Sequence, residues 1–374
     1  MLKTLLRKRL IFISLGLFLI APLLLTGCSG GIFSASSWPG VTVDGTTLYV
    51  AYGTYIHAFD MERGSELWHF PAETDRTLSF YAPPAVTATG LVIVGGYDNS
   101  VYSLDSETGS ISGWASPFED PTDRIIGAPL IVEDWILVPS ADGRLYAIDT
   151  ETGQPVWEKP YQPSEDPGPL WSSPIIDGET IYLASLDHHV YAIELSTGEE
   201  IWRTTDLGGA ISDSPALSDG LILVGTFGES LIAIDATNGK TEWSYDTAGW
   251  VWSSPVVFDG IVYFGDTAGF AYAVEAETGN ELWQKSIDGA IGASPAVDEN
   301  AVYFVTETGV VHAADPTSGG ALWPNDTTLE GQLLSDPILH NGQLFLGVIT
   351  PECVVYAVET DNGRAGCAVS PVEQ

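Results

Sequence analysis

The sequence predicts an all-β protein, an eight-bladed β-propeller of four-stranded antiparallel blades, and three observations support this. From about residue 38 to the C-terminus a unit ending in Ala-x-Asp-x-x-Thr-Gly-x-x-x-Trp recurs, most clearly at Ala147–Trp157, Ala233–Trp243 and Ala273–Trp283. Its tryptophans lie 40 to 46 residues apart, a period typical of propeller blades. The 40 glycines and 23 prolines suit short strands joined by tight turns, and no apolar period near 3.6 residues follows residue 30.

The N-terminus has the features of an export signal. Residues Met1–Arg9 are basic, Leu10–Leu25 are apolar, and a Leu-Thr-Gly-Cys sequence that ends at Cys28 matches the bacterial lipoprotein box. We therefore expect a signal peptide over residues 1–27, a short tether over 28–37 and the propeller over 38–374. A retained signal anchor is the alternative, because the apolar run is marginally long enough to span a bilayer.

Cys28 is the predicted lipidation site. Several acyl chains on one residue hold a protein firmly at a membrane, since each buried methylene contributes roughly 0.8 kcal/mol. We expect an exported protein, anchored by this lipid to the outer face of the cytoplasmic membrane or to the outer membrane.

The sixth unit illustrates the expected blade. Ser253–Val257 reads as the innermost strand and Asp259-Gly260 as a hairpin turn. The second and third strands are expected at Ile261–Gly265 and Phe270–Glu275, with apolar residues on both faces because neighbouring blades cover them. A fourth strand contains Trp283.

The recurring residues are expected to hold the blades together, because a residue needed in every unit serves the scaffold. The acidic slot accepts backbone N–H groups in its turn, the glycine adopts positive φ, and the tryptophan docks between blades. The acidic slot holds Asp60, Asp105, Asp149, Glu194, Asp235, Glu275, Asp315 and Glu359. The glycine slot holds Gly64, Gly109, Gly153, Gly198, Gly239, Gly279, Gly319 and Gly363. The tryptophan slot holds Trp68, Trp114, Trp157, Trp202, Trp243, Trp283 and Trp323.

The eighth unit departs from the pattern, with Cys367 in the tryptophan slot. Cys353 lies in the same unit, and an exported compartment permits disulfides. We predict a Cys353–Cys367 disulfide that strengthens the last blade where the ring closes. Two free buried thiols are the alternative.

The charge excludes one class of partner. The chain carries 13 basic and 50 acidic residues, a formal net charge of −37. Nucleic-acid affinity depends on Lys and Arg that neutralise phosphates, so we expect no nucleic-acid binding.

The repeat resembles the PQQ-type β-propeller repeat over residues 38 to 374. That resemblance implies eight blades, as in the quinoprotein alcohol dehydrogenases and in the BamB lipoproteins, where the propeller is a scaffold of the outer-membrane β-barrel assembly machinery. The repeat therefore indicates the fold and leaves catalysis and docking both open.

The residues disfavour catalysis. Quinoprotein dehydrogenases carry an adjacent cysteine pair over the cofactor, a calcium held by Glu and Asn, and a catalytic Asp, whereas this sequence has no adjacent cysteine pair. His188-His189 is expected in a solvated turn. The histidines show no metal-ligand spacing, and we predict no enzyme, cofactor or metal site; they are His57, His69, His188, His189, His312 and His340.

Two regions are candidates for binding. The junctions from each tryptophan to the next inner-strand proline are 15 or more residues long after Trp68, Trp114 and Trp157, against 12 after Trp243. Loops on a rigid scaffold often bind partners. Their aromatics either form a docking surface or fold back onto the rim; they are Phe70, Phe80, Tyr81, Phe118, Tyr161 and Trp171.

The second region is the channel mouth, where the residues before each inner-strand proline converge. Trp250 and Trp252 are candidates to stack a planar ligand, beside Asp213 and Asp336. The alternative is packing within a plugged channel.

These observations predict a non-catalytic, lipid-anchored, BamB-like scaffold that binds an envelope or membrane protein. The alternative is a propeller that binds PQQ with calcium, or another small ligand, as a dehydrogenase or a sensor.

Overall fold

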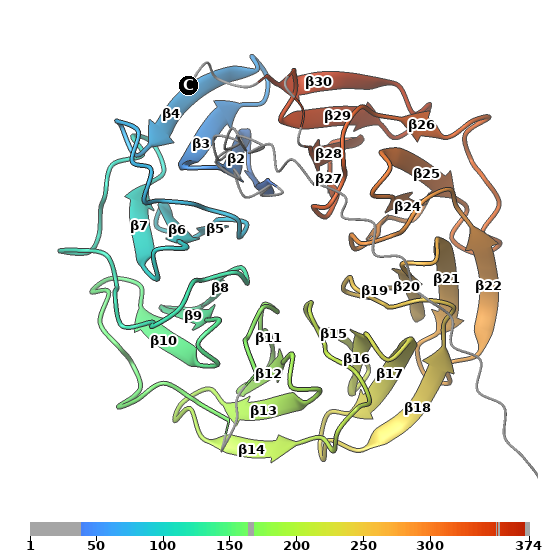
Figure 1. Cartoon of the computed structure of the whole chain (residues 1–374), viewed down its shortest axis with the longest axis horizontal. Helices are drawn as coiled ribbons and strands as arrows, with labels where there is room; N and C mark the ends of the chain where they lie inside the picture. The colour runs from blue at the N-terminus through green and yellow to red at the C-terminus, as the bar shows by residue number, and fades with distance from the viewer. Residues whose placement is uncertain (1–38, 164–167, 349, 351, 371–374) are drawn as a thin grey trace, which may run out of the picture. The chain divides into compact units, whose positions relative to one another are not determined.

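The computed structural model describes residues 39–163, 168–348, 350 and 352–370, and these residues contain strands and no helix. The predicted signal peptide and tether, with Cys28, lie outside the described residues. Eight small antiparallel sheets follow one another around a ring, each built from one continuous segment of chain (Figure 1). The predicted β-propeller is confirmed. Nowhere in these residues is there a helix long and apolar enough to cross a membrane.

The first four blades are built as follows. Blade 1 contains β1 (Gly40–Asp44), β2 (Thr47–Tyr52), β3 (Tyr55–Asp60) and β4 (Ser65–Phe70). Blade 2 contains β5 (Ala85–Val86), β6 (Leu91–Gly95) and β7 (Val101–Asp105). Blade 3 contains β8 (Leu130–Val132), β9 (Trp135–Pro139) and β10 (Leu145–Asp149). Blade 4 contains β11 (Ile175–Asp177), β12 (Thr180–Ala184), β13 (Val190–Glu194) and β14 (Glu200–Arg203).

The other four blades have four strands each. Blade 5 contains β15 (Ala216–Ser218), β16 (Leu221–Thr226), β17 (Ser230–Asp235) and β18 (Thr241–Asp246). Blade 6 contains β19 (Val256–Phe258), β20 (Ile261–Gly265), β21 (Phe270–Glu275) and β22 (Glu281–Ser286). Blade 7 contains β23 (Ala296–Val297), β24 (Val302–Val305), β25 (Val310–Ala314) and β26 (Thr327–Thr328). Blade 8 contains β27 (Ile338–His340), β28 (Gln343–Gly347), β29 (Val355–Glu359) and β30 (Ala365–Val369).

The fourth strand of blades 2 and 3 is reduced to isolated bridges. In blade 2, Ile111 bridges Leu104 and Phe118 bridges Val101. In blade 3, Pro155 and Tyr161 take the same places. The outermost strand of these two blades is therefore interrupted.

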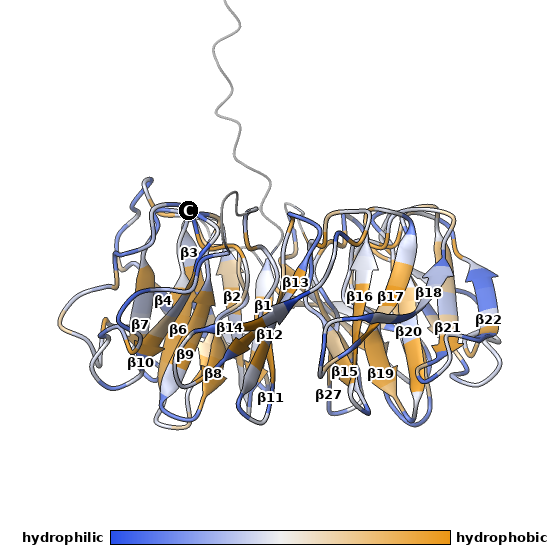
Figure 2. Cartoon of the chain, turned by 90° about the horizontal axis from the view of Figure 1, so that it is seen from below, coloured by the Kyte–Doolittle hydropathy of each residue, from blue (hydrophilic) through white to orange (hydrophobic). Residues whose placement is uncertain are grey.

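The core is divided among the eight junctions between blades. The strands of each blade present apolar side chains to both neighbours, and the outer strand β22 is hydrophilic (Figure 2). Seven clusters join consecutive blades, and an eighth joins blade 8 to blade 1 through residues such as Val355 and Phe59. Because no strand is shared between blades 8 and 1, side-chain packing closes the ring.

In the sixth unit β20 and β21 have the predicted bounds and β22 contains Trp283, whereas the innermost strand β19 covers Val256–Phe258 and not the predicted Ser253–Val257. Asp259 and Gly260 have φ of 49° and 74°, as the hairpin turn requires. The acidic slot also behaves as expected: Asp105 Oδ1 accepts the backbone N–H groups of Glu107 and Thr108 at 3.1 and 2.8 Å.

Each tryptophan of the slot joins its blade to the next one. The Trp68 indole lies against Gly109, where an added Cβ would come within 2.4 Å of the ring, so glycine is needed there for space as well as for its φ of 68°. Trp68 Nε1 donates a hydrogen bond to the backbone oxygen of Ser106 at 2.8 Å. The same indole-to-carbonyl bond recurs at 2.9 to 3.1 Å from Trp114, Trp157, Trp202, Trp243, Trp283 and Trp323.

The predicted Cys353–Cys367 disulfide is present in the last blade and spans 14 residues. The assignment of Cys367 to the tryptophan position of the repeat needs a correction. In blade 6 the register places Ala273 opposite Trp283, whereas in blade 8 Ala357 lies opposite Gly366 and Cys367 lies opposite Tyr356. The β-bulge of this strand pair lies between Val355 and Tyr356, whereas blade 6 has it after Ala273, so Gly366 replaces the tryptophan in space.

Candidate functional site

Most loop aromatics that the sequence offers as a docking surface are buried. The sequence left two arrangements open, and four of these residues do not form an exposed docking surface: Phe80, Tyr81, Phe118 and Tyr161 are each at most 8% exposed and pack on the rim. The alternative reading, in which they fold back, describes them correctly. Phe70 and Trp171 are partly buried.

The reason is that each ring fills a gap beside the next blade. Phe118 packs edge-on against Tyr146 with 5.8 Å between ring centroids, and Tyr161 packs against Tyr191 in the same way at 6.0 Å. Burial of an aromatic ring is worth a few kcal/mol, which favours the folded-back arrangement. These rings therefore offer little surface to a partner.

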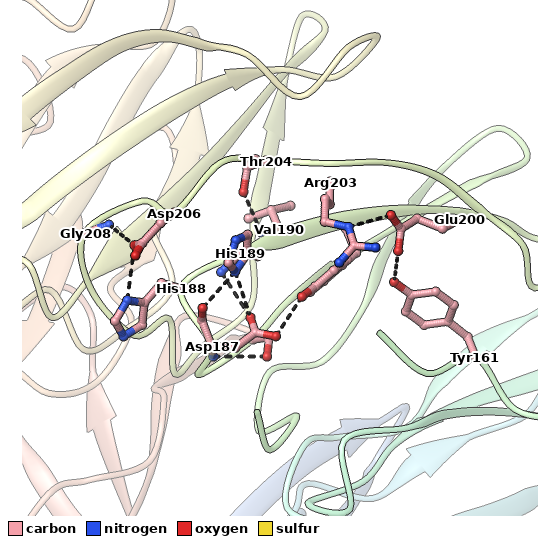
Figure 3. Close-up of polar contacts among 12 residues, drawn as sticks. Tyr161, Asp187, His188, His189, Val190, Glu200, Arg203, Thr204, Asp206 and Gly208 are labelled. Atoms are coloured by element: carbon pink, nitrogen blue, oxygen red, sulfur yellow. Dashed lines mark hydrogen bonds and ion pairs between the residues drawn. The ribbon is translucent and has the colours of Figure 1, made fainter. Parts of the chain in front are cut away.

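Tyr161 also joins a polar network around blade 4 (Figure 3). Its hydroxyl donates to Glu200 Oε2 at 2.7 Å, and Arg203 Nε donates to Glu200 Oε1 at 2.8 Å. Burial, followed by the bonded Glu200 carboxylate, raises the pKa of Tyr161. The tyrosine therefore stays a neutral donor.

The adjacent histidines His188 and His189 lie in the turn between β12 and β13 and point apart (Figure 3). His188 Nδ1 lies 3.2 Å from Asp206 Oδ1, while His189 Nδ1 lies 2.8 Å from the backbone oxygen of Asp187. The predicted turn is confirmed, and the two rings do not share a ligand position.

The residues before the inner-strand prolines form a belt of polar contacts between blades 4 and 8. Asp213 accepts the backbone N–H of Ser214 at 2.7 Å and that of Ser254 at 3.1 Å. Asp336 accepts the backbone N–H of Ser294 at 2.7 Å. Both acids therefore tie neighbouring blades together at the inner end of the ring.

The two belt carboxyls are unusual acids. Asp213 is half-buried, and Asp336 is reached by water although protein atoms surround it. Desolvation raises the pKa of Asp213. Desolvation and then repulsion from Asp213 raise the pKa of Asp336 to about 7. Carboxyl groups with strongly raised pKa values also occur at functional sites.

An aromatic shelf lies beside this belt, formed by Phe227, Trp250 and Trp252. Phe227 stacks on both tryptophans, with ring centroids 5.2 Å from Trp250 and 4.8 Å from Trp252. Trp250 is 47% exposed, which is exceptional for a ring of this size. The sequence identified the tryptophans and missed Phe227, because it comes from the β16–β17 loop of the previous blade.

A third cluster was also missed. β3 and β4 pair His57 with His69, and Glu66 lies on the same strand pair. Glu66 Oε1 is 2.7 Å from His57 Nδ1 and 3.2 Å from His69 Nδ1. Nothing in the linear spacing reveals this group, since strand pairing alone brings it together.

Comparison with protein-family models matches most of the chain to one family. The family model described as outer membrane protein assembly factor BamB matches residues 52–205, 186–269 and 268–366. A BamB of Bordetella pertussis is 30% identical over 123 residues, covering 30% of this chain and 31% of that protein.

Two dehydrogenases share similar levels of identity. A quinohemoprotein alcohol dehydrogenase of Comamonas testosteroni is 27% identical over 34% of this chain and 21% of its own length. A lanthanide-dependent methanol dehydrogenase of Methylacidiphilum fumariolicum is 30% identical over 32% of this chain and 22% of its own length. The matches thus span less than a third of each of these relatives.

Solved structures share the fold. The crystal structure of BamB from Moraxella catarrhalis superposes with a TM-score of 0.66 at 18% identity, covering 82% of this chain and 90% of that one. The computationally designed Ika8 protein superposes with a TM-score of 0.71 at 16% identity, covering 84% of this chain and 95% of that one. At these identities the likeness concerns the fold alone.

Proposed function

Because the chain belongs to the family of outer membrane protein assembly factor BamB, we propose that it is a non-catalytic scaffold that binds a protein of the cell envelope. The observation that carries this is the extent of the match. The family model extends from residue 52 to residue 366, and the BamB of Bordetella pertussis is matched over 31% of its length. The two dehydrogenases are matched over 21% and 22% of theirs.

The proposal includes an anchor at Cys28. The Leu-Thr-Gly-Cys sequence after an apolar run supports it, and a lipid there holds the ring beside a membrane. A rigid ring on a tether suits docking, because its many loops are fixed by the eight packed junctions.

Co-purification from membranes tests the scaffold. The full chain, tagged at its C-terminus, is cross-linked in its own cells and purified after the membranes are solubilised. The expected result is enrichment of a defined membrane protein over an unrelated tagged lipoprotein. Cys28→Ser should move the chain out of the membrane fraction and weaken that enrichment. Recovery of no protein beyond the control would overturn the proposal.

A second candidate function rests on the aromatic shelf. Exposed Trp250 with Phe227 and Trp252 offers a surface on which a planar ligand such as PQQ could stack. The fit is partial, since both carboxylate oxygens of Asp213 and one of Asp336 already accept backbone N–H groups.

Thermal unfolding separates the two functions. A ligand present at 100 times its Kd stabilises a protein by about 2.7 kcal/mol, which raises the melting temperature measurably. The scaffold proposal predicts no change with PQQ and calcium. A rise that Trp250→Ala abolishes would favour the second candidate.

A further inference from the structure

Among the residues that the structure describes, no tryptophan fills the closing junction between blades 8 and 1, whereas one fills each of the other seven junctions. At the other seven, an indole lies over the turn glycine of the next blade and donates to the carbonyl that follows the acidic slot. At the closing junction the turn glycine is Gly64, with φ of 63°, and the nearest atom to an added Cβ is the Ala368 oxygen at 3.6 Å.

A cavity of about 200 Å³ lies at this place. Blade 1 contributes Asp60, Met61 and Gly64, which are the acidic slot, the residue after it and the turn glycine. Blade 8 contributes Phe345, Ala357 and Ala368, among others. The walls are therefore the equivalents of those that hold tryptophan elsewhere in the ring.

We propose that this cavity, the closing-seam cavity, binds a tryptophan side chain of a partner polypeptide. The indole lies over Gly64 and donates its N–H to the Met61 backbone oxygen, the equivalent of the Ser106 oxygen that accepts from Trp68. The equivalent pocket at each of the seven other junctions holds an indole, which is the reason for choosing this side chain. Tryptophan is also among the residues that anchor protein interfaces most strongly. The inference rests on the proposed scaffold function.

Met61 makes the cavity observable. The chain has two methionines, Met1 and Met61, so labelling of the methionine methyl groups with ¹³C yields at most two signals, and Met61→Leu identifies that of Met61. N-acetyl-tryptophanamide is titrated into the full chain, with N-acetyl-leucinamide as the control. The proposal predicts a saturable shift of the Met61 methyl with the tryptophan compound only. No shift up to its solubility limit, or an equal shift with both compounds, would overturn it.

The substitution Gly366→Trp tests the cavity with an indole that belongs to this chain. Gly366 lies opposite Ala357, and nothing lies within 4 Å of an added Cβ, so the new indole can enter the cavity and exclude the probe. The matched control is Ile201→Trp, at an exposed position of β14. The shift should vanish in the first variant and persist in the second; its persistence in both contradicts the proposal. If Gly366→Trp fails to fold, the wild-type titration still decides.

Two further outcomes would each overturn the proposal for a different reason. A Met61 shift that depends on protein concentration without any probe would replace the partner with a second copy of this chain, and so overturn the proposal. Loss of probe binding in Gly366→Trp with unchanged co-purification would mean that the scaffold function stands and the cavity is not its docking point, which also contradicts it.

A separate observation concerns His57, Glu66 and His69. One ligand atom from each lies within 4.8 Å of the others, on two paired strands that fix their positions. Two imidazoles and one carboxylate form a zinc-ligand set that leaves a fourth position for water.

We propose that His57, His69 and Glu66 bind a divalent transition-metal ion, with zinc as the reference case. The rings use Nδ1, the atoms that already face Glu66. The strongly acidic chain adds a general attraction for cations without supplying further ligands.

Zinc binding to the metal-stripped full chain is measured by calorimetry and by the melting temperature. The expected result is one tight site per chain, lost in His69→Ala and weakened at least tenfold in Glu66→Gln. His312→Ala is the control, because His312 contacts a carboxylate, Asp326, without belonging to a three-ligand group. Absence of a tight site, or an unchanged one in His69→Ala, would overturn this proposal.

Discussion

At the scale of the residue, Asp336 shows how the ring sets the chemistry of a single side chain. Its side chain is reached by water, but its carboxyl is partly desolvated and accepts one backbone N–H from Ser294, while Asp213 adds negative charge nearby. Desolvation and repulsion both favour the protonated form, which raises its pKa to about 7. Asp336 therefore keeps its proton to a higher pH than an ordinary aspartate.

This raised pKa predicts a pH-dependent effect of Asp336→Asn. A raised folded-state pKa stabilises the fold below the ordinary value of 3.8, and that contribution is lost as pH rises to about 7. The variant, which retains the amide acceptor and cannot ionise, should become progressively more stable than the wild type over this range. Urea unfolding of both proteins at several pH values measures this difference in stability. The turn carboxylates are present in both proteins, so their contributions to the pH dependence cancel. A difference independent of pH would contradict the assignment.

At the scale of the element, the tryptophan is the contact that binds one blade to the next. Trp283 is 6% exposed and donates to the Pro316 oxygen at 2.9 Å, while its ring lies against Gly319. The neighbouring Leu282 is skipped by the β-bulge and is 41% exposed. Because Trp283 is buried and Leu282 is exposed on the same strand, comparing the two residues separates the effect of burial from that of strand position.

Trp283→Ala is expected to destabilise the protein by about 3–5 kcal/mol, because it empties a packed junction and removes a hydrogen bond. Leu282→Ala, one residue away, should change stability by less than about 0.5 kcal/mol. Midpoints of urea unfolding compare them directly. Equal effects would mean that the indole does not hold the junction.

The disulfide acts on the last blade only. It closes a span of 14 residues, so its removal is expected to cost about 3 kcal/mol through the freedom of the unfolded chain. The double variant Cys353→Ala and Cys367→Ala should lower stability by this amount and become insensitive to reductant. Wild-type protein that is equally insensitive would show that the bond does not form.

Repetition explains which parts of this description could be predicted from the sequence. The strands of the sixth unit follow the motif closely, because each motif residue has one local task, as at Asp259-Gly260. Contacts that join distant segments could not be read in this way. Phe227 reaches Trp250 from another loop, His57 meets Glu66 only through strand pairing, and a shifted bulge places Gly366 where the sequence puts Cys367.

At the scale of the whole molecule, the closing seam differs from the other junctions. The ring closes by packing between the first and last blades, with no shared strand and no indole. Every other junction is already filled by a residue of this chain. A scaffold that must accept a partner side chain therefore has its clearest opening at the seam.

Site-specific photocross-linking in cells tests most directly whether this ring binds a polypeptide. A photoreactive residue replaces Met61 at the seam, Trp250 at the aromatic shelf, or Ile201 as the exposed control on blade 4. The account predicts one discrete adduct with a membrane protein from position 61 and none from position 201. No protein adduct from either position 61 or position 250 would contradict it.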